Sequence, residues 1–260
     1  MAQGFEICDA NGKMQFNGDM LTYALRVSGT TYVEDRKVGN TCPTSFLIPT
    51  SQTYPNALIA IGGGNGYAAA SAGIWGSTGQ KIYGTNGAPA GTPFTYYIFE
   101  KSNTIPASGF GLEVRNAANE ITFSTNHRVM RVLNLLSGNT VDGEQVVTYG
   151  GRQLAFCQGA WAGHRISGEK VYYGAGGGGP TVPDQDGGDG GENYVAWQND
   201  GKIYGGLVAD NGQTVRTRMV SWDDVQIGPG PDADQPPDFY IPLNMFVVDV
   251  TGVPVGQQFY

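Results

Sequence analysis

Four carboxylates lie among glycines in the segment DQDGGDGGE, residues 184–192. Asp184, Asp186, Asp189 and Glu192 offer oxygen ligands on a glycine-rich chain, and oxygen is the ligand atom that Ca²⁺ takes in proteins. Their spacing matches neither an EF-hand loop nor the consecutive nonapeptides of an RTX repeat. Two interpretations follow, a calcium site or a solvated acidic loop, and the irregular spacing favours the loop.

The segment GGGNGYAA, residues 62–69, contains the G-x-G-x-x-A pattern of a dinucleotide-binding turn. Such a site also needs a helix after the glycines and an acidic residue about 20 positions later for the ribose. Neither Asp nor Glu occurs between Asp35 and Glu100, and Gly73 interrupts the alanine-rich stretch. We therefore expect a strand that ends in a surface loop, and no nucleotide or other cofactor.

Residues for catalysis are few. The sequence contains two histidines, His127 and His164, and neither a G-x-S-x-G nor an H-E-x-x-H motif. Cys157 precedes His164 by seven residues with glycines between them, which favours two sides of a turn over a thiol–imidazole pair. The adjacent Asp223 and Asp224 would point to opposite faces of a strand. The sequence therefore predicts a protein without enzymatic activity.

Aromatic residues crowd the second half of the chain. Side chains that alternate along strands send half of these rings into a core, while rings that face outward suit recognition of a partner. The candidates for partner or receptor contact are Trp161, Tyr172, Tyr173 and Trp197.

The elements that would carry these residues are short strands. Gly accounts for 41 of 260 residues, and charged residues make up 15% against about a quarter in an ordinary domain. Strand-like pieces such as QVVTY, RQLAF, KVYY and MFVVDV recur between turn signals, including Asp200-Gly201 and Asn211-Gly212. The segment HRVMRVLNLL (127–136) is the best helix candidate, and its valines favour a strand. We predict an all-β fold of the sandwich type.

Charge and cysteine content exclude several classes of partner. The net charge is −8 and no basic run is present, so nucleic acid is not expected to bind. Apolar runs such as ALIAI (57–61) are too short to cross a bilayer, and the amino terminus does not resemble a secretory signal. Three widely spaced cysteines favour free buried thiols of a reducing compartment over a disulfide framework.

The two halves of the chain are similar in sequence. Residues 4–16, GFEICDANGKMQF, align without a gap to residues 111–123, GLEVRNAANEITF. Apolar alternation around Asn11-Gly12 in the first copy and Ala118-Asn119 in the second predicts a β-hairpin in each. KIYG recurs at 81–84 and 202–205, and YYIFE (96–100) has a counterpart in MFVVD (245–249). We predict two tandem β-sandwich-like modules, 1–105 and 106–260, the second with long Gly-rich insertions.

The segments GFEICDANG (4–12), TYYIFEK (95–101) and GLEVRNAANEITF (111–123) resemble small tail proteins of long-tailed bacteriophages. The likeness covers both module starts and the end of the first module. It departs at Asn119, where Gly is commoner in that family, and in the length of the 174–192 loop. The resemblance implies a virion protein of the tail tip or tail fibre that is assembled in the bacterial cytoplasm. It also implies binding to other tail subunits and to a host receptor or glycan, and a homo-oligomer such as a trimer or ring.

Two function classes follow. The first is a structural protein of the phage tail, whose Gly-rich segments 174–192 and 228–238 would face the host. The alternative is a β-sandwich protein that binds or cleaves glycans of the host surface. Cleavage requires two carboxylates that face one groove at a set separation, whereas the acidic residues here concentrate in loops.

Overall fold

The computed structural model describes residues 6–8, 14–17, 21–38, 42–106, 110–138, 143–159, 162–173, 194–230 and 239–258. Within these ranges the chain forms β-strands and no α-helix, so the predicted all-β class is confirmed. None of the helical turns in these ranges is long and apolar enough to span a membrane. The turns are the 3₁₀ segments η1 (Ser51–Thr53), η2 (Gly76–Thr78), η3 (Ser102–Thr104) and η5 (Asp210–Gly212).

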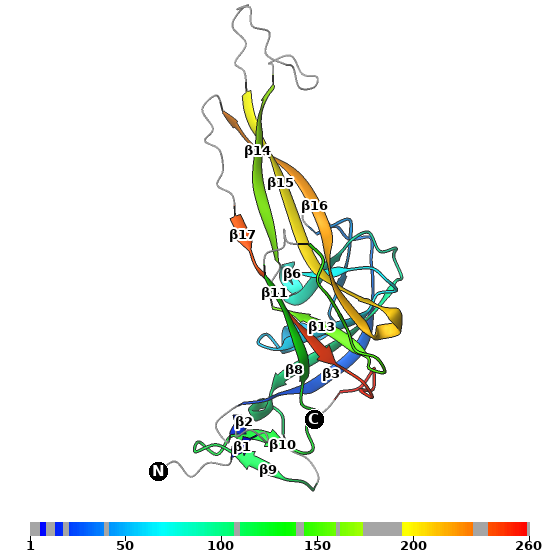
Figure 1. The fold of residues 1–260 in the computed structure, drawn as a ribbon, viewed down its shortest axis with the longest axis vertical. Coiled ribbons are helices and arrows are strands. Elements are labelled where there is room, and N and C mark those ends of the chain that lie inside the picture. Colours follow the sequence, from blue (N-terminus) through cyan, green and yellow to red (C-terminus); the bar gives the residue numbers. More distant parts are fainter. Residues whose placement is uncertain are drawn as a thin grey trace, which may run out of the picture.

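The first large sheet contains six antiparallel strands (Figure 1). Its two central strands have apolar residues at successive positions because both faces of the sheet are covered. From one edge to the other, the strands are β11 (Arg131–Gly138), β18 (Leu243–Asp249), β13 (Leu154–Gln158), β5 (Leu58–Gly63), β8 (Pro93–Lys101) and β3 (Tyr23–Tyr32). The expected strand within HRVMRVLNLL is thus confirmed as β11.

The second sheet has six strands along its main path, with two further strands attached. In order, the main path is β12 (Val146–Thr148), β16 (Thr214–Gly230), β15 (Tyr194–Ala209), β6 (Ala69–Trp75), β7 (Gln80–Thr85) and β4 (Thr44–Leu47). The attached strands are β14 (Ala162–Tyr173), which pairs with β15, and β17 (Phe239–Ile241), which pairs with β14.

Four strands of the second sheet continue beyond the body of the molecule (Figure 1). β15 and β16 are 16 and 17 residues long, about three times the usual strand length. Their outer parts pair with each other, and β14 continues the sheet on the other side of β15. We call this projection, made of β14, β17, residues 194–203 and residues 221–230, the arm.

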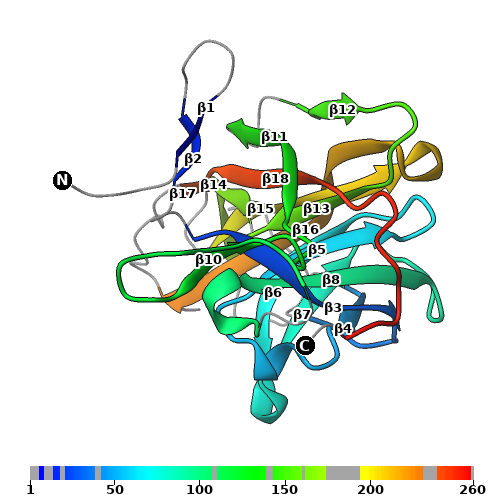
Figure 2. The ribbon, with the colours of Figure 1, turned by 90° about the horizontal axis from the view of Figure 1, so that it is seen from below.

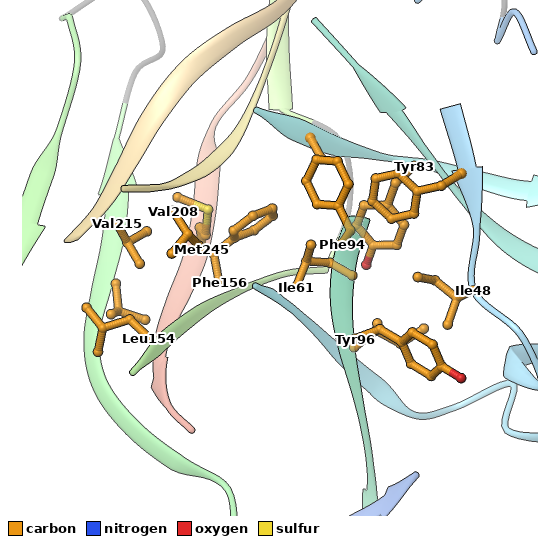
Figure 3. Packing of buried hydrophobic residues seen from close by; sticks show 14 of the residues in the cluster. Ile48, Ile61, Tyr83, Phe94, Tyr96, Leu154, Phe156, Val208, Val215 and Met245 are labelled. Carbon is orange, nitrogen blue, oxygen red and sulfur yellow. The ribbon is translucent and has the colours of Figure 1, made fainter. Parts of the chain in front are cut away.

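The two sheets pack face to face around one hydrophobic core, as Figure 2 shows in a view along the molecule and Figure 3 in close-up. Phe94 and Ile61 come from the first sheet, and Tyr83 comes from the second. The ring of Phe46 stacks on that of Phe94 with a centroid distance of 4.4 Å. Each large apolar side chain that is fully buried in this way contributes about 1.5–3 kcal/mol.

Strands from both halves of the chain share both sheets. In the first sheet, β3, β8 and β5 from one half meet β13, β18 and β11 from the other, with Ile61 opposite Phe156 at the junction. In the second sheet, β4, β7 and β6 meet β15, β16 and β12, with Ala69 opposite Gly206. Each half contributes its strands in the same relative order. The predicted division into modules 1–105 and 106–260, each with its own sandwich, is therefore not confirmed.

The repeated segments near residues 4 and 111 form two hairpins of identical register. β1 (Glu6–Cys8) pairs with β2 (Met14–Asn17), and β9 (Glu113–Arg115) pairs with β10 (Ile121–Ser124). Ile7 lies opposite Phe16 in the first hairpin, and Val114 lies opposite Phe123 in the second. Both predicted hairpins are confirmed, and both lie at the end of the molecule away from the arm (Figure 1).

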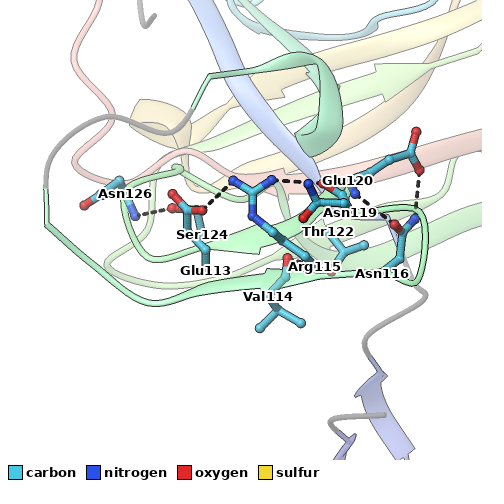
Figure 4. Close-up of polar contacts among 9 residues, drawn as sticks. All are labelled: Glu113, Val114, Arg115, Asn116, Asn119, Glu120, Thr122, Ser124 and Asn126. Carbon is cyan, nitrogen blue, oxygen red and sulfur yellow. Dashed lines mark hydrogen bonds and ion pairs between the residues drawn. The ribbon is translucent and has the colours of Figure 1, made fainter. Parts of the chain in front are cut away.

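A side chain closes the turn of the second hairpin, where the sequence lacks Asn-Gly (Figure 4). Asn116 Oδ1 accepts hydrogen bonds from the backbone N–H groups of Ala118, at 3.0 Å, and Glu120, at 2.9 Å. Asn119 has a φ of 63°, a left-handed conformation that Asn adopts more easily than most residues. The Asn116 side chain thus takes over the role of a backbone turn.

Two local predictions were wrong. Asp200-Gly201 lies in the middle of β15, because Asp200 pairs with Ile166 on one side and Asp224 on the other, so no turn forms there. The two KIYG segments lie in β7 and β15, which do not occupy equivalent positions in the two halves, so this match does not mark the repeat. By contrast, YYIFE and MFVVD lie in the equivalent strands β8 and β18, and Asn211-Gly212 forms the predicted turn.

Candidate functional site

A cleft of about 490 Å³ opens where the central strands of both sheets end. One wall is the glycine-rich loop after β5, and the opposite wall is the η5 turn between β15 and β16. Between these walls lie Thr95 and Tyr97 of β8, together with Gln153 and Leu154 at the start of β13. The volume lies in the range of small-molecule sites, which is about 300–1,000 Å³.

Hydrogen-bonding side chains line this cleft, and none of the lining residues is Lys, Arg or His. Asp210 contributes a carboxylate, while Asn65 and Asn211 contribute amides from opposite walls. Tyr97 is 6% exposed, and burial raises the pKa of its phenol above the ordinary value. Gln153 Nε2 donates to the carbonyl oxygen of Asn211 at 3.1 Å and thereby ties the start of β13 to the η5 turn.

Left-handed backbone shapes both walls of the cleft. Asn65, Asp210 and Asn211 have φ angles of 49°, 52° and 54°, and they are three of the five residues other than glycine with positive φ in the described ranges. Such a conformation costs about 1–2 kcal/mol for an L-residue. Gly66 and Gly212, which adjoin them, also have positive φ but bear no side chain. The three polar residues therefore retain their side chains at positions where glycine would be less strained.

The aromatic candidates lie on the arm, away from the cleft. Tyr172 and Tyr173 are in β14, and Trp197 is in the neighbouring strand β15, where it pairs with Lys170. Tyr173 pairs with Tyr194, the first residue of β15. Trp161 lies outside the described residues.

The calcium hypothesis concerns residues that the structure does not describe. Asp184, Asp186, Asp189 and Glu192 lie outside the described residues, as does nearly all of the two Gly-rich segments 174–192 and 228–238. Within the described ranges, no group of three or more His, Cys, Asp or Glu side chains is arranged to hold a metal ion.

An apolar surface flanks the edge strand β11. Val132 lies opposite Val248, and Leu135 lies opposite Phe246, so these side chains share the outer face of the first sheet. Val132, Leu135 and Phe246 are 49%, 47% and 38% exposed. We call these three residues the edge patch.

The two edges of the first sheet are covered differently. At β3, the N–H of Leu25 donates to the carbonyl of Arg128 at 2.8 Å, and that of Ser28 donates to Gln257 at 2.9 Å, so other segments of the chain continue the hydrogen bonding. At β11, side chains occupy some edge groups instead: Tyr149 Oη donates to the Leu133 carbonyl at 3.2 Å. Some backbone groups of the β11 edge are thus already hydrogen-bonded, which hinders the addition of a further strand. The apolar side chains of the edge patch remain exposed.

Cys157, which the sequence analysis considered as a possible nucleophile, is buried in the body of the molecule. Cys157 lies in β13, and burial raises the pKa of its thiol to about 12. A nucleophilic cysteine requires the opposite shift, toward a thiolate at neutral pH. His164 lies in β14, where it pairs with Lys202 and Tyr240.

Sequence reasoning did not identify the cleft. It recognised the glycine loop and the Asn211-Gly212 turn as separate local features, about 145 residues apart. Their proximity depends on the pairing of β5 with β13 and of β6 with β15, which no local pattern encodes. The signal in the sequence that could have indicated the cleft is the pair of Asn-containing turns beside glycines, at Asn65 and at Asn211.

Comparison with protein families, curated proteins and solved structures finds no match to this chain.

Proposed function

We propose that this protein is a non-catalytic structural component of a bacteriophage tail tip or tail-fibre assembly. In this role it attaches to neighbouring tail subunits and reaches toward the host surface. The proposal rests on the sequence resemblance of the hairpin segments and of β8, and the observation that carries it is the shape of the molecule. A two-sheet body has two repeated hairpins at one end and a long β-arm at the other (Figure 1).

The arm supports the host-facing part of the proposal. From Tyr194 to Ile203, β15 extends the sheet by about 30 Å at the usual rise per residue. Because β15 is hydrogen-bonded to β14 on one side and to β16 on the other along this length, the arm is built on three paired strands and is not a loop. Three strands can support one another where an isolated two-stranded hairpin is marginal in water. Such a projection can hold a contact surface away from the body.

The edge patch supports the attachment part. Monomeric proteins expose scattered apolar residues singly, whereas adjacent ones mark contact sites. Val132, Leu135 and Phe246 adjoin one another on one sheet face. We infer that the edge patch is the contact between copies in a ring or trimer.

The alternative, a protein that cleaves host glycans, has weaker support. Glycoside hydrolysis uses two carboxyl groups about 5–10 Å apart that flank the scissile bond. Of the residues that line the cleft, Asp210 is the one carboxylate. The lining therefore favours binding over bond cleavage.

The direct test is to locate the protein in particles of the bacteriophage that encodes it. We expect mass spectrometry to detect it in purified tails, and electron microscopy of particles labelled with specific antibody to place the label at the tail tip or at the base of the fibres. Protein that is found in infected cells but never in purified particles would refute the proposal.

A shortened arm loop tests which end faces the host. Tyr173 and Tyr194 pair directly, so an Asn-Gly turn can replace residues 174–193 without disturbing the register. We expect the variant to enter particles normally and host adsorption to fall. Asn119→Gly, in the hairpin at the other end, is the control and should adsorb like the wild type. Normal adsorption by the shortened variant would show that this loop does not contact the host.

A further inference from the structure

We propose that the cleft between the 62–66 loop and the η5 turn binds a neutral saccharide, one or two sugar rings in size. The site is distinct from the arm and from the edge patch, and the inference does not depend on the tail assignment. It rests on the shape of the cleft and on the chemistry of its lining.

The lining excludes strongly charged ligands. Phosphate and carboxylate groups are bound in proteins by Arg, Lys or clusters of N–H donors, and no basic side chain lines this cleft. Arg216 approaches Asp210 to 3.8 Å, but both side chains are substantially exposed and Arg216 does not line the cleft. A metal ion is equally disfavoured, because Asp210 is the one carboxylate among the lining residues.

The lining matches the chemistry of a sugar. Each sugar hydroxyl both donates and accepts a hydrogen bond, so its site must mix acceptors with donors. A carboxylate only accepts, an amide does both from two atoms, and a hydroxyl does both from one. Asp210 supplies a carboxylate, and Asn65 and Asn211 supply amides. Thr95 and Tyr97 supply hydroxyl groups. Buried Leu154 and Val250 add a small apolar area, which suits the C–H face of a sugar ring.

Tyr97 adds a hydroxyl group to the lining of the cleft. This residue is 6% exposed, lines the cleft and makes no hydrogen bond to any other residue that the structure describes. Its hydroxyl group is reached by solvent and is not sealed in the core. It can therefore donate to or accept from a ligand hydroxyl that enters the cleft.

The walls are already shaped for a ligand. Asn65 and Asn211 hold left-handed conformations, and the Gln153–Asn211 hydrogen bond fixes the η5 turn against β13. Binding to a preformed site avoids the entropic cost of ordering loops. The two amides on opposite walls are therefore positioned to contact the same sugar.

The residues with positive φ can also be replaced by glycine without disturbing the fold. Glycine adopts positive φ without strain, so Asn65→Gly and Asn211→Gly remove the amides while preserving the backbone. Asn119→Gly makes the same chemical change at a φ of 63° in the β9–β10 hairpin and is the matched control. Asp210→Asn keeps the size of the side chain and removes its charge.

The experiment is saturation-transfer NMR of the full-length protein with glucose, galactose, mannose, rhamnose and N-acetylglucosamine. We expect at least one neutral sugar to bind, with an affinity that falls by about tenfold or more in the Asn65→Gly/Asn211→Gly double variant. Asp210→Asn should lower the affinity for the same sugar, and Asn119→Gly should bind that sugar with an affinity within about twofold of the wild type. The uronic acid of that sugar should bind more weakly than its neutral parent, because its carboxylate would lie near Asp210.

Three results would overturn the proposal. The first is the absence of transfer to every sugar in the panel. The second is binding that is unchanged in the double variant, which would place the ligand elsewhere. The third is tighter binding of the uronic acid than of its neutral parent. Because these are measurements on isolated protein, they are separable from the particle experiments that test the tail assignment.

Discussion

Replacing Gly205 by alanine tests how the two halves of the chain join. Gly205 lies in β15 beside the single register pair, Gly206 with Ala69, that links β15 to β6. A Cβ atom on Gly205 would lie 2.5 Å from the carbonyl carbon of Ala69 and 2.9 Å from the Cα of Ala70, and it would overlap the Ala69 carbonyl oxygen. All three are backbone atoms of β6, so no side-chain rotation can relieve the overlap.

The expected destabilisation follows from that geometry. Overpacking in a well-packed region costs about 1–3 kcal/mol, and displacement of β6 also breaks backbone hydrogen bonds worth about 1 kcal/mol each. We expect Gly205→Ala to lower the free energy of unfolding by about 3 kcal/mol or more, out of a total of about 5–15 kcal/mol for a typical protein. For a chain of this size, that loss corresponds to a melting temperature lower by about 6–12 °C.

Two further glycines serve as controls in urea denaturation followed by circular dichroism. Gly159→Ala meets open space at an ordinary φ, so it should leave stability unchanged or slightly raised. Gly66→Ala also meets open space but at a φ of 87°, so it should cost about 1–2 kcal/mol from backbone strain alone. If Gly205→Ala unfolds with the same free energy as Gly159→Ala, the close approach of β15 to β6 is refuted.

The remaining predictions concern charge, assembly and thiols. Burial opposes ionisation of Asp249, but hydrogen bonds from Thr251 and Arg152 outweigh it and hold the pKa below its ordinary value. A depressed pKa means that this stabilisation is present above about pH 4 and is lost as the pH falls further. Urea midpoints measured between pH 6 and pH 3 should therefore fall less in Asp249→Asn than in wild type, and equal slopes would contradict the assignment. Leu135→Glu should shift light-scattering mass toward the monomer while changing stability by less than about 0.5 kcal/mol; an unchanged mass would remove the edge patch as the contact between copies. Cys42 and Cys157 are buried, and they should resist iodoacetamide in the native protein but react fully in urea; rapid native labelling on peptide mapping would show that the body opens.

Much of the local structure could be predicted from sequence because it depends on neighbouring residues. The alternation around Phe16 and Phe123 gives two hairpins of identical register, and the Asn211-Gly212 signal gives the turn between β15 and β16. The glycines at 62–66 end β5, and another strand, β6, follows them in place of the helix that a dinucleotide site needs. In each case a backbone preference or a period of two operates over fewer than about ten residues.

The failures occurred where pairing partners override a local signal. Asp200-Gly201 is a strong hairpin signal in isolation, yet β14 and β16 pair with it from both sides and keep it extended. The predicted separate sandwiches of modules 1–105 and 106–260 are not confirmed, for a related reason. Each half contributes three strands to the main path of each sheet, and in the first sheet the innermost strands of the two halves, β5 and β13, pair with each other across the boundary.

The sequence by itself determined the strand class and the duplicated hairpins, because composition and short-range periodicity are sufficient for these. The tertiary structure alone decided that the halves fuse edge to edge, that β14–β16 extend as an arm, and that Asn65 and Asn211 line the same cleft. Those features depend on hydrogen bonds between strands far apart in the chain. A strand's own residues specify its two faces but not which neighbour will satisfy its edges.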